Sequence, residues 1–205
     1  DHWHYGHWIL PSALIGWIPG NALYFLLSAW GNLQNGAAFR SAMNLQMPVL
    51  HLFTALGILL IPYFSNLVHS GNLTELRRKL WIAIAIFGII ALLYCMLLLL
   101  ANKKLFGIFY AGKFMQVAHL VPVLSIFLFF ASFTAVLGTI LRCLRATRAI
   151  FIVAISSAVV SLTAGFLLIP RLGVRGAVFT MIISSTCEAA VMSLMLMYTW
   201  REMKR

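Results

Sequence analysis

The sequence predicts an all-α integral membrane protein with six transmembrane helices. Its 205 residues are 62% hydrophobic and only 9% charged, whereas soluble domains carry about 25% charged residues. A span needs about 20 predominantly apolar residues. Three long stretches without Asp, Glu, Lys or Arg meet this need, at 80–102, 119–141 and 149–170. Three more apolar stretches follow the same rule, at 8–30, 47–68 and 176–199, the last containing Glu188.

A transmembrane barrel and a secretory signal peptide are poor alternatives. Barrel strands alternate apolar and polar residues, whereas the stretch 81–100 is apolar on every side. The first segment lacks the basic start and the cleavage site of a signal peptide. Because the chain starts at Asp1 and reaches an apolar segment within a few residues, we expect it to be a piece of a longer protein.

The basic residues predict the orientation in the membrane. Six spans put both termini on one side, where nine Lys and Arg residues are expected, against six on the other side. The positive-inside rule therefore predicts that both termini are cytoplasmic. The net charge of +11 lies in short loops beside the membrane, which favours anionic lipid headgroups as partners and gives no indication of nucleic-acid binding. An anionic substrate would explain the outer basic residues.

Two connections between spans have distinctive sequences. Pro170 is expected to end the fifth helix, and Gly173 and Gly176 allow a tight outer turn. On the other side, the segment 70–80 predicts a short helix on the membrane surface. Asn72 is its expected N-cap, with a glutamate three residues later.

Glu188 lies near the middle of the sixth predicted span, where an acid costs about 2.5–3.5 kcal/mol to insert. Thr180, Ser184 and Ser185 lie on the same helical face. This polar stripe is expected to face other helices or a water-filled cavity. Two interpretations remain open: an acid that contacts substrate or couples transport to protons, and a buried acid that only hydrogen-bonds to a neighbouring helix.

The second span carries a candidate phosphate site at its outer end. Arg40, Asn44 and His51 are spaced to share one face of a continuous helix. A cation and hydrogen-bond donors along one face suit a phosphate group. The alternative is that Arg40 only extends to the lipid headgroups.

The first span has its own polar face, formed by Asn21, Tyr24 and Ser28. The adjacent Pro19 and Gly20 are expected to break or kink this helix. Broken helices line the cavities of many transporters, although a kink that serves only packing is an equal alternative.

Small residues recur at intervals of four in the fifth span, at Ser157, Ser161 and Gly165. Such spacing lets helices approach closely, and we assign these residues to packing.

The sequence predicts neither an enzyme nor a cofactor or metal site. The chain has only four acidic residues and no P-loop, Gly-x-Ser-x-Gly or His-Glu-x-x-His motif. The three cysteines are far apart and are expected to act as small apolar residues: Cys95, Cys143 and Cys187. Three N-terminal histidines form a possible but unfavoured metal site, since aromatic flanks also favour the membrane interface: His2, His4 and His7.

Four segments together resemble the Wzx-type polysaccharide flippases, which export O-antigen and exopolysaccharide units. The segment 52–80 contains an Ile-Pro-x-x-Ser corner followed by "GNLTELRRKL". The segment 137–184 contains "LRATR" and the turn "IPRLGVRGA". The segment 31–49 contains "FRSAMN", and 105–114 reads "LFGIFYAGKF". The resemblance covers nearly all of the chain and matches the second six-helix lobe of a transporter with twelve or more helices.

The resemblance implies movement of an undecaprenyl-pyrophosphate-linked oligosaccharide across the bacterial inner membrane by alternating access, for lipopolysaccharide or other surface polysaccharide biosynthesis. It also implies an N-terminal six-helix lobe of the same protein as partner, and possible contact with a polysaccharide polymerase. The expected substrate-binding residues are Arg40, Asn44, His51, Asn21, Tyr24 and Glu188. The family often has an acid in the middle of the first helix of this lobe, where this chain has Asn21 and Ala22.

Three other functions stay open. A cation-coupled drug or small-molecule antiporter of the same superfamily would use an intramembrane acid such as Glu188. A membrane enzyme would need His, Asp or Glu clusters, which the predicted outer loops lack. A membrane subunit that does not itself transport is the third.

Overall fold

The structure, a computed structural model, describes the backbone of residues 2–203 and the side chains of residues 11–201. The chain is all α-helical over this range, without a strand. The helices are α1 (His2–Trp30), α2 (Leu33–Asn44), α3 (Met47–His69), α4 (Leu73–Tyr110), the 3-10 helix η1 (Met115–Leu120), α5 (Val121–Leu124), α6 (Ile126–Cys143), α7 (Thr147–Leu172) and α8 (Val174–Met203).

Six of the described helices are long and apolar enough to cross a membrane: α1, α3, α4, α6, α7 and α8. They correspond in order to the six predicted spans, so the predicted fold class is confirmed. The fourth span starts later than expected, at Ile126 rather than 119. The preceding residues form η1 and α5, and a turn at Ser125 separates α5 from α6.

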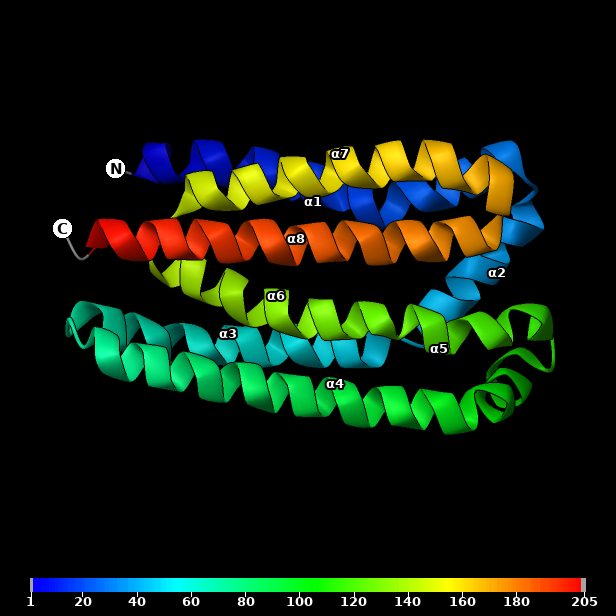
Figure 1. The fold of residues 1–205 in the computed structure, drawn as a ribbon, viewed down its shortest axis with the longest axis horizontal. Helices are drawn as coiled ribbons and strands as arrows, with labels where there is room; N and C mark the ends of the chain where they lie inside the picture. Colours follow the sequence, from blue (N-terminus) through cyan, green and yellow to red (C-terminus); the bar gives the residue numbers. More distant parts are fainter. Residues whose placement is uncertain (1, 204–205) are drawn as a thin grey trace.

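The spanning helices form two groups of three (Figure 1). In one group α7 packs against both α1 and α8, and in the other α6 packs against both α3 and α4. Contact between α6 and α8 joins the groups. The start of α1 and the end of α8 lie at the same end of the bundle, together with the α3–α4 and α6–α7 connections (Figure 1). We call this the terminal end, and the opposite one the far end.

The predicted surface helix at 70–80 is not a separate element, because α4 runs unbroken from Leu73 for 38 residues. At 1.5 Å per residue it is about 57 Å long, which exceeds the ~30 Å hydrocarbon core. The Asn72 cap is confirmed: Asn72 Oδ1 accepts a hydrogen bond from the Glu75 backbone N–H at 3.1 Å. Leu76, Leu80 and Ala83 are all buried, so one apolar face continues from the surface into the membrane and no break is needed.

Pro170 does not end α7, and of the break or kink expected at Pro19 and Gly20, the break does not occur. Helix α7 continues past Pro170 to Leu172, and α1 continues through Pro19 and Gly20. A proline removes only one backbone hydrogen bond, and neighbouring helices make this tolerable inside a membrane. The turn after α7 instead depends on Gly173, whose φ of 57° and ψ of −129° suit glycine alone.

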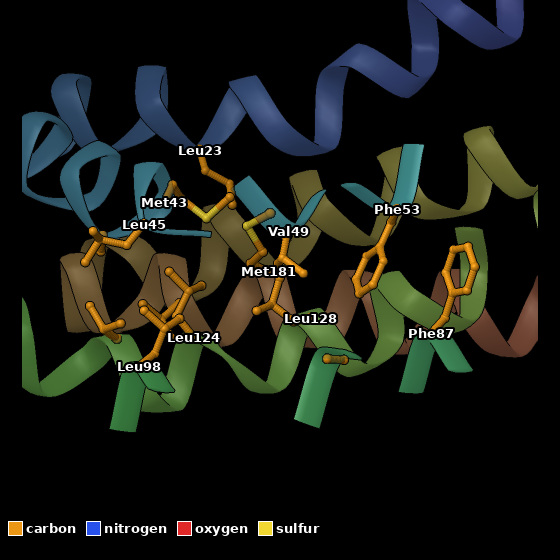
Figure 2. Packing of buried hydrophobic residues seen from close by; sticks show 14 of the residues in the cluster. Leu23, Met43, Leu45, Val49, Phe53, Phe87, Leu98, Leu124, Leu128 and Met181 are labelled. Carbon is orange, nitrogen blue, oxygen red and sulfur yellow. The ribbon is translucent and has the colours of Figure 1, made fainter. Parts of the chain in front are cut away.

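Large apolar side chains fill the space between the helices, as Figure 2 shows for part of the buried cluster. Phe53 of α3 stacks on Phe87 of α4 with ring centroids 5.4 Å apart. Small residues of α7 allow closer approach to α1, as predicted. Ser161 Oγ donates to the Pro19 carbonyl at 3.3 Å, and a Cβ on Gly165 would lie 2.9 Å from the Leu26 side chain.

Cysteine labelling tests this topology. With the three native cysteines replaced by alanine, single cysteines at Leu33 and Leu172 are expected to react with a membrane-impermeant maleimide from one side, and a cysteine at Ser70 only from the other. Leu33 and Leu172 are exposed at the far end, and Ser70 is exposed at the terminal end. The positive-inside rule further predicts that the Ser70 side is cytoplasmic. Labelling of Leu33 and Ser70 from the same side would contradict the fold.

Candidate functional site

Arg40 is exposed near the end of α2, at the corner where α2 packs against α1 and leads into α3. The Asn32 side chain caps α2 by accepting from the Asn35 N–H at 2.9 Å. Helix α2 buries Phe39 and leaves Arg40 exposed. The Arg40 guanidinium carbon lies 5.6 Å from the centroid of the Tyr24 ring, which is a cation–π distance. The Tyr24 ring also packs on Phe39, with centroids 5.4 Å apart, so the ring that holds the cation is itself fixed.

The predicted phosphate face is therefore only partly present. Arg40 and Tyr24 lie together, which sequence spacing did not indicate because they belong to different helices. His51 is separated from Arg40: α2 ends at Asn44, and His51 belongs to α3. The expected single helical face is thus wrong. Pro48 explains the break, since a proline ring clashes with the carbonyl four residues earlier, here that of Asn44.

Asn44 belongs to a hydrogen-bonded clamp between the α2–α3 corner and α4. Its Nδ2 donates to Tyr110 Oη at 3.4 Å, and Tyr110 Oη donates to the Ser41 carbonyl at 3.2 Å. Tyr94 Oη donates to the Leu45 carbonyl at 2.6 Å. These partners are 49 to 69 residues apart in the chain, so no local sequence pattern indicates them. The clamp fixes Asn44 one helical turn after Arg40.

The same corner contains a buried glutamine that the sequence analysis missed. Gln46 is fully buried, and its Nε2 donates to Ser125 Oγ at 3.4 Å. Its Oε1 has no hydrogen-bond partner among the side chains and backbone that the structure describes. Ser125 is the residue at which α5 and α6 separate, so this contact joins the α2–α3 corner to the break in the fourth span.

Glu188 lies at the middle of α8, at a cavity of about 340 Å³ between α1, α6, α7 and α8. Its carboxyl group lies near the Ser157 hydroxyl group of α7. Ser157 Oγ lies 3.1 Å from Ser184 Oγ, and Ser184 Oγ is 3.2 Å from the Ser157 carbonyl. The predicted polar stripe is confirmed for Ser184 and Ser185, which line the cavity. Thr180 does not line the cavity, but it is fully buried between the helices and donates to the Gly176 carbonyl of its own helix.

Two residues of this cavity do more than the sequence predicts. Ser157, expected to serve packing alone, lies between Glu188 and Ser184. Arg142, one of the nine basic residues predicted on the side of the termini, lies in the last turn of α6 and lines the same cavity as Glu188. The cavity therefore combines a carboxyl group, a guanidinium and several hydroxyl groups, drawn from helices that are distant in sequence.

Helix α1 connects the two regions. Pro19 and Gly20 line the Glu188 cavity, and Tyr24, which holds Arg40, follows Gly20 by about one helical turn. Asn21 lies between them, half-buried, and donates to the Trp17 carbonyl of its own helix at 2.9 Å. Of the predicted residues, the structure thus brings Arg40, Tyr24 and Asn44 to one corner, puts Glu188 in a separate cavity, and leaves His51 exposed on α3.

Comparison of the chain with protein-family models, curated proteins and solved structures gives no match. Among the side chains that the structure describes, no group of three His, Cys, Asp or Glu residues is close enough to hold a metal ion. The side chains of His2, His4 and His7, on which the metal alternative depends, lie outside the described residues.

Proposed function

We propose that this chain is a six-helix lobe of a transporter that moves an undecaprenyl-pyrophosphate-linked oligosaccharide across the bacterial inner membrane by alternating access, for cell-surface polysaccharide biosynthesis. The observation that carries the proposal is Arg40, a cation that lies against the Tyr24 ring on α2, the helix that follows the turn at the far end of the bundle (Figure 1). No hydrogen bond or ion pair to it occurs within the described part of the chain, so its N–H donors are available to a ligand.

The chemistry of the substrate fits this arrangement. A pyrophosphate that leaves water needs cationic donors, and a guanidinium supplies parallel N–H groups that match phosphate oxygens. The aromatic ring fixes the direction of the guanidinium without neutralising its charge. Arg142, at the Glu188 cavity and towards the terminal end, supplies a second cation within the same lobe. The apolar outer surface of the bundle lets the lipid tail stay in the bilayer.

Deletion of the full-length gene in its own host tests this proposal. Surface polysaccharide is expected to disappear, while the lipid-linked oligosaccharide accumulates with its sugar on the side of synthesis. Complementation with the full-length gene is expected to restore the polymer. Normal surface polysaccharide in the deletion strain, with no accumulated precursor, would contradict the proposal.

A cation-coupled antiporter is a second candidate, favoured by the Glu188 cavity. A carboxyl group in the middle of a spanning helix, beside serine hydroxyl groups, is a typical element of a proton or cation pathway.

Glu188→Gln separates the two candidates. Under the flippase proposal we expect polysaccharide export within about twofold of wild type, because glutamine preserves the shape of the side chain and its ability to hydrogen-bond, and Glu188 is not a phosphate ligand. An antiporter would lose cation-driven efflux in this variant. Export is measured as surface polymer per cell at several external pH values, at matched protein levels. Normal surface polymer in both Glu188→Gln and Arg40→Ala, together with loss of cation-driven efflux in Glu188→Gln, would favour the antiporter.

A further inference from the structure

A long apolar groove runs along the outside of the bundle over α6. Helices α4 and α8 both pack against α6 but have little or no contact with each other over the described residues, so α6 forms the floor and the other two form the walls. Figure 1 shows α6 lying between α8 and α4. Two pockets of about 430 and 800 Å³ share Ile84, Phe133 and Ser193, which makes them parts of one groove. We call it the α4/α6/α8 groove.

The terminal end of this groove is cationic. Arg77 of α4 and Arg201 of α8 line its opposite walls, and no carboxylate is among its lining residues that the structure describes. Trp81 and Trp200 lie beside them in the same pocket. Tryptophan is enriched at the depth of the lipid headgroups, so the two arginines are at the level where lipid phosphates lie.

The groove is apolar where an acyl chain would lie. From Arg77 to Gly88, both next to the groove, α4 rises about 16 Å. The groove continues beyond Gly88 to Leu99, and its first part, from Arg77 to Gly88, matches one leaflet, or half of the ~30 Å hydrocarbon core. The lining over this distance includes Trp81, Ile84 and Phe133.

We propose that the α4/α6/α8 groove is a binding site for an anionic phospholipid of the leaflet at the terminal end. Its phosphate is held between Arg77 and Arg201, and its acyl chains lie along α6. Basic pockets between transmembrane helices bind anionic headgroups in this way. The charge favours this ligand over a zwitterionic phospholipid, whose own cationic group would meet two guanidinium groups. The site is independent of the transport proposal, because neither Arg40 nor Glu188 lines it.

Lipid binding to the purified full-length protein tests the site. Native mass spectrometry with phosphatidylglycerol and phosphatidylcholine of identical acyl chains is expected to give tighter binding of phosphatidylglycerol. The double variant Arg77→Gln/Arg201→Gln is expected to weaken phosphatidylglycerol binding by about tenfold or more and to leave phosphatidylcholine binding unchanged. Arg78→Gln is the matched control: Arg78 is exposed on the same turn of α4 but does not line the groove, and its loss is expected to have little effect.

A second pair of variants tests the apolar part without changing charge. Ser193→Trp fills the point where the two pockets meet and is expected to reduce binding of both lipids. Leu194→Trp is the control, because Leu194 is 59% exposed and outside the groove. Equal binding of the two lipids by the wild type, unchanged binding by the double arginine variant, or a protein dimer that covers the groove and excludes both lipids would overturn the proposal.

Discussion

Replacing Arg40 with alanine is expected to reduce polysaccharide export by about 10- to 100-fold, because a hydrogen bond to a charged group is worth about 1.5–3 kcal/mol. The variant removes the guanidinium that the Tyr24 ring presents at 5.6 Å. Since Arg40 is exposed and the core residue beside it is Phe39, the fold and the expression level should not change. Export is measured as surface polymer in a deletion strain that carries the full-length variant at matched levels.

Three further variants define what Arg40 does. Arg40→Lys is expected to restore export only in part, because an ammonium lacks the planar fork of a guanidinium. Tyr24→Phe should export normally, since phenylalanine retains the ring that contacts the cation. Lys104→Ala is the charge control: Lys104 is an exposed cation on α4, and its loss should leave export near the wild-type level. Equal effects of Lys104→Ala and Arg40→Ala would mean that general surface charge matters and not this corner.

Gly176→Ala is expected to lower the free energy of unfolding by about 2–3 kcal/mol, a value typical of overpacking. A Cβ at this position would overlap the Leu168 carbonyl oxygen, with the carbonyl carbon at 2.7 Å and the Ile169 Cα at 3.0 Å. These are backbone atoms of α7, so no side chain can rotate away. Because α7 packs extensively against α8, the whole hairpin must separate to admit the methyl group. Denaturant titration in detergent micelles measures the change.

Gly88→Ala is the matched control for this substitution. Gly88 is inside α4, and a Cβ added there meets nothing within 4 Å. Since alanine favours helix by about 1 kcal/mol over glycine, this variant should be as stable as the wild type or slightly more so. If Gly176→Ala unfolds at the same denaturant concentration as the wild type, the close contact between α7 and α8 is absent.

The number and order of spans could be predicted from the sequence because each needs only a local property, a long apolar stretch. Prolines and helix caps predicted the ends of the helices less reliably. Pro170 and Pro19 lie inside helices, since packing between membrane helices compensates a single missing backbone bond. The prediction of a separate helix at 70–80 was wrong for a related reason. The N-cap at Asn72 is present, but nothing between Leu76 and Leu80 ends the helix that starts after it.

The candidate site could be predicted only residue by residue. Arg40 and Glu188 are conspicuous in sequence because charge is rare in this chain. Their neighbours were not, since Tyr24, Ser157 and Arg142 come from other helices and meet them only after packing. The prediction that His51 shares a face with Arg40 requires one continuous helix. The helix is interrupted before Pro48, so the two residues belong to different helices.

Reconstitution of the purified full-length protein into liposomes tests the central proposal most directly. The liposomes contain an undecaprenyl-pyrophosphate-linked saccharide, and a membrane-impermeant enzyme that cleaves the sugar reports which leaflet holds it. With the protein present, the account predicts that the fraction protected in the inner leaflet becomes accessible, and that Arg40→Ala slows this movement. A protected fraction that stays unchanged, in liposomes where the same protein exchanges a soluble cation across the membrane, would contradict the account and favour the antiporter.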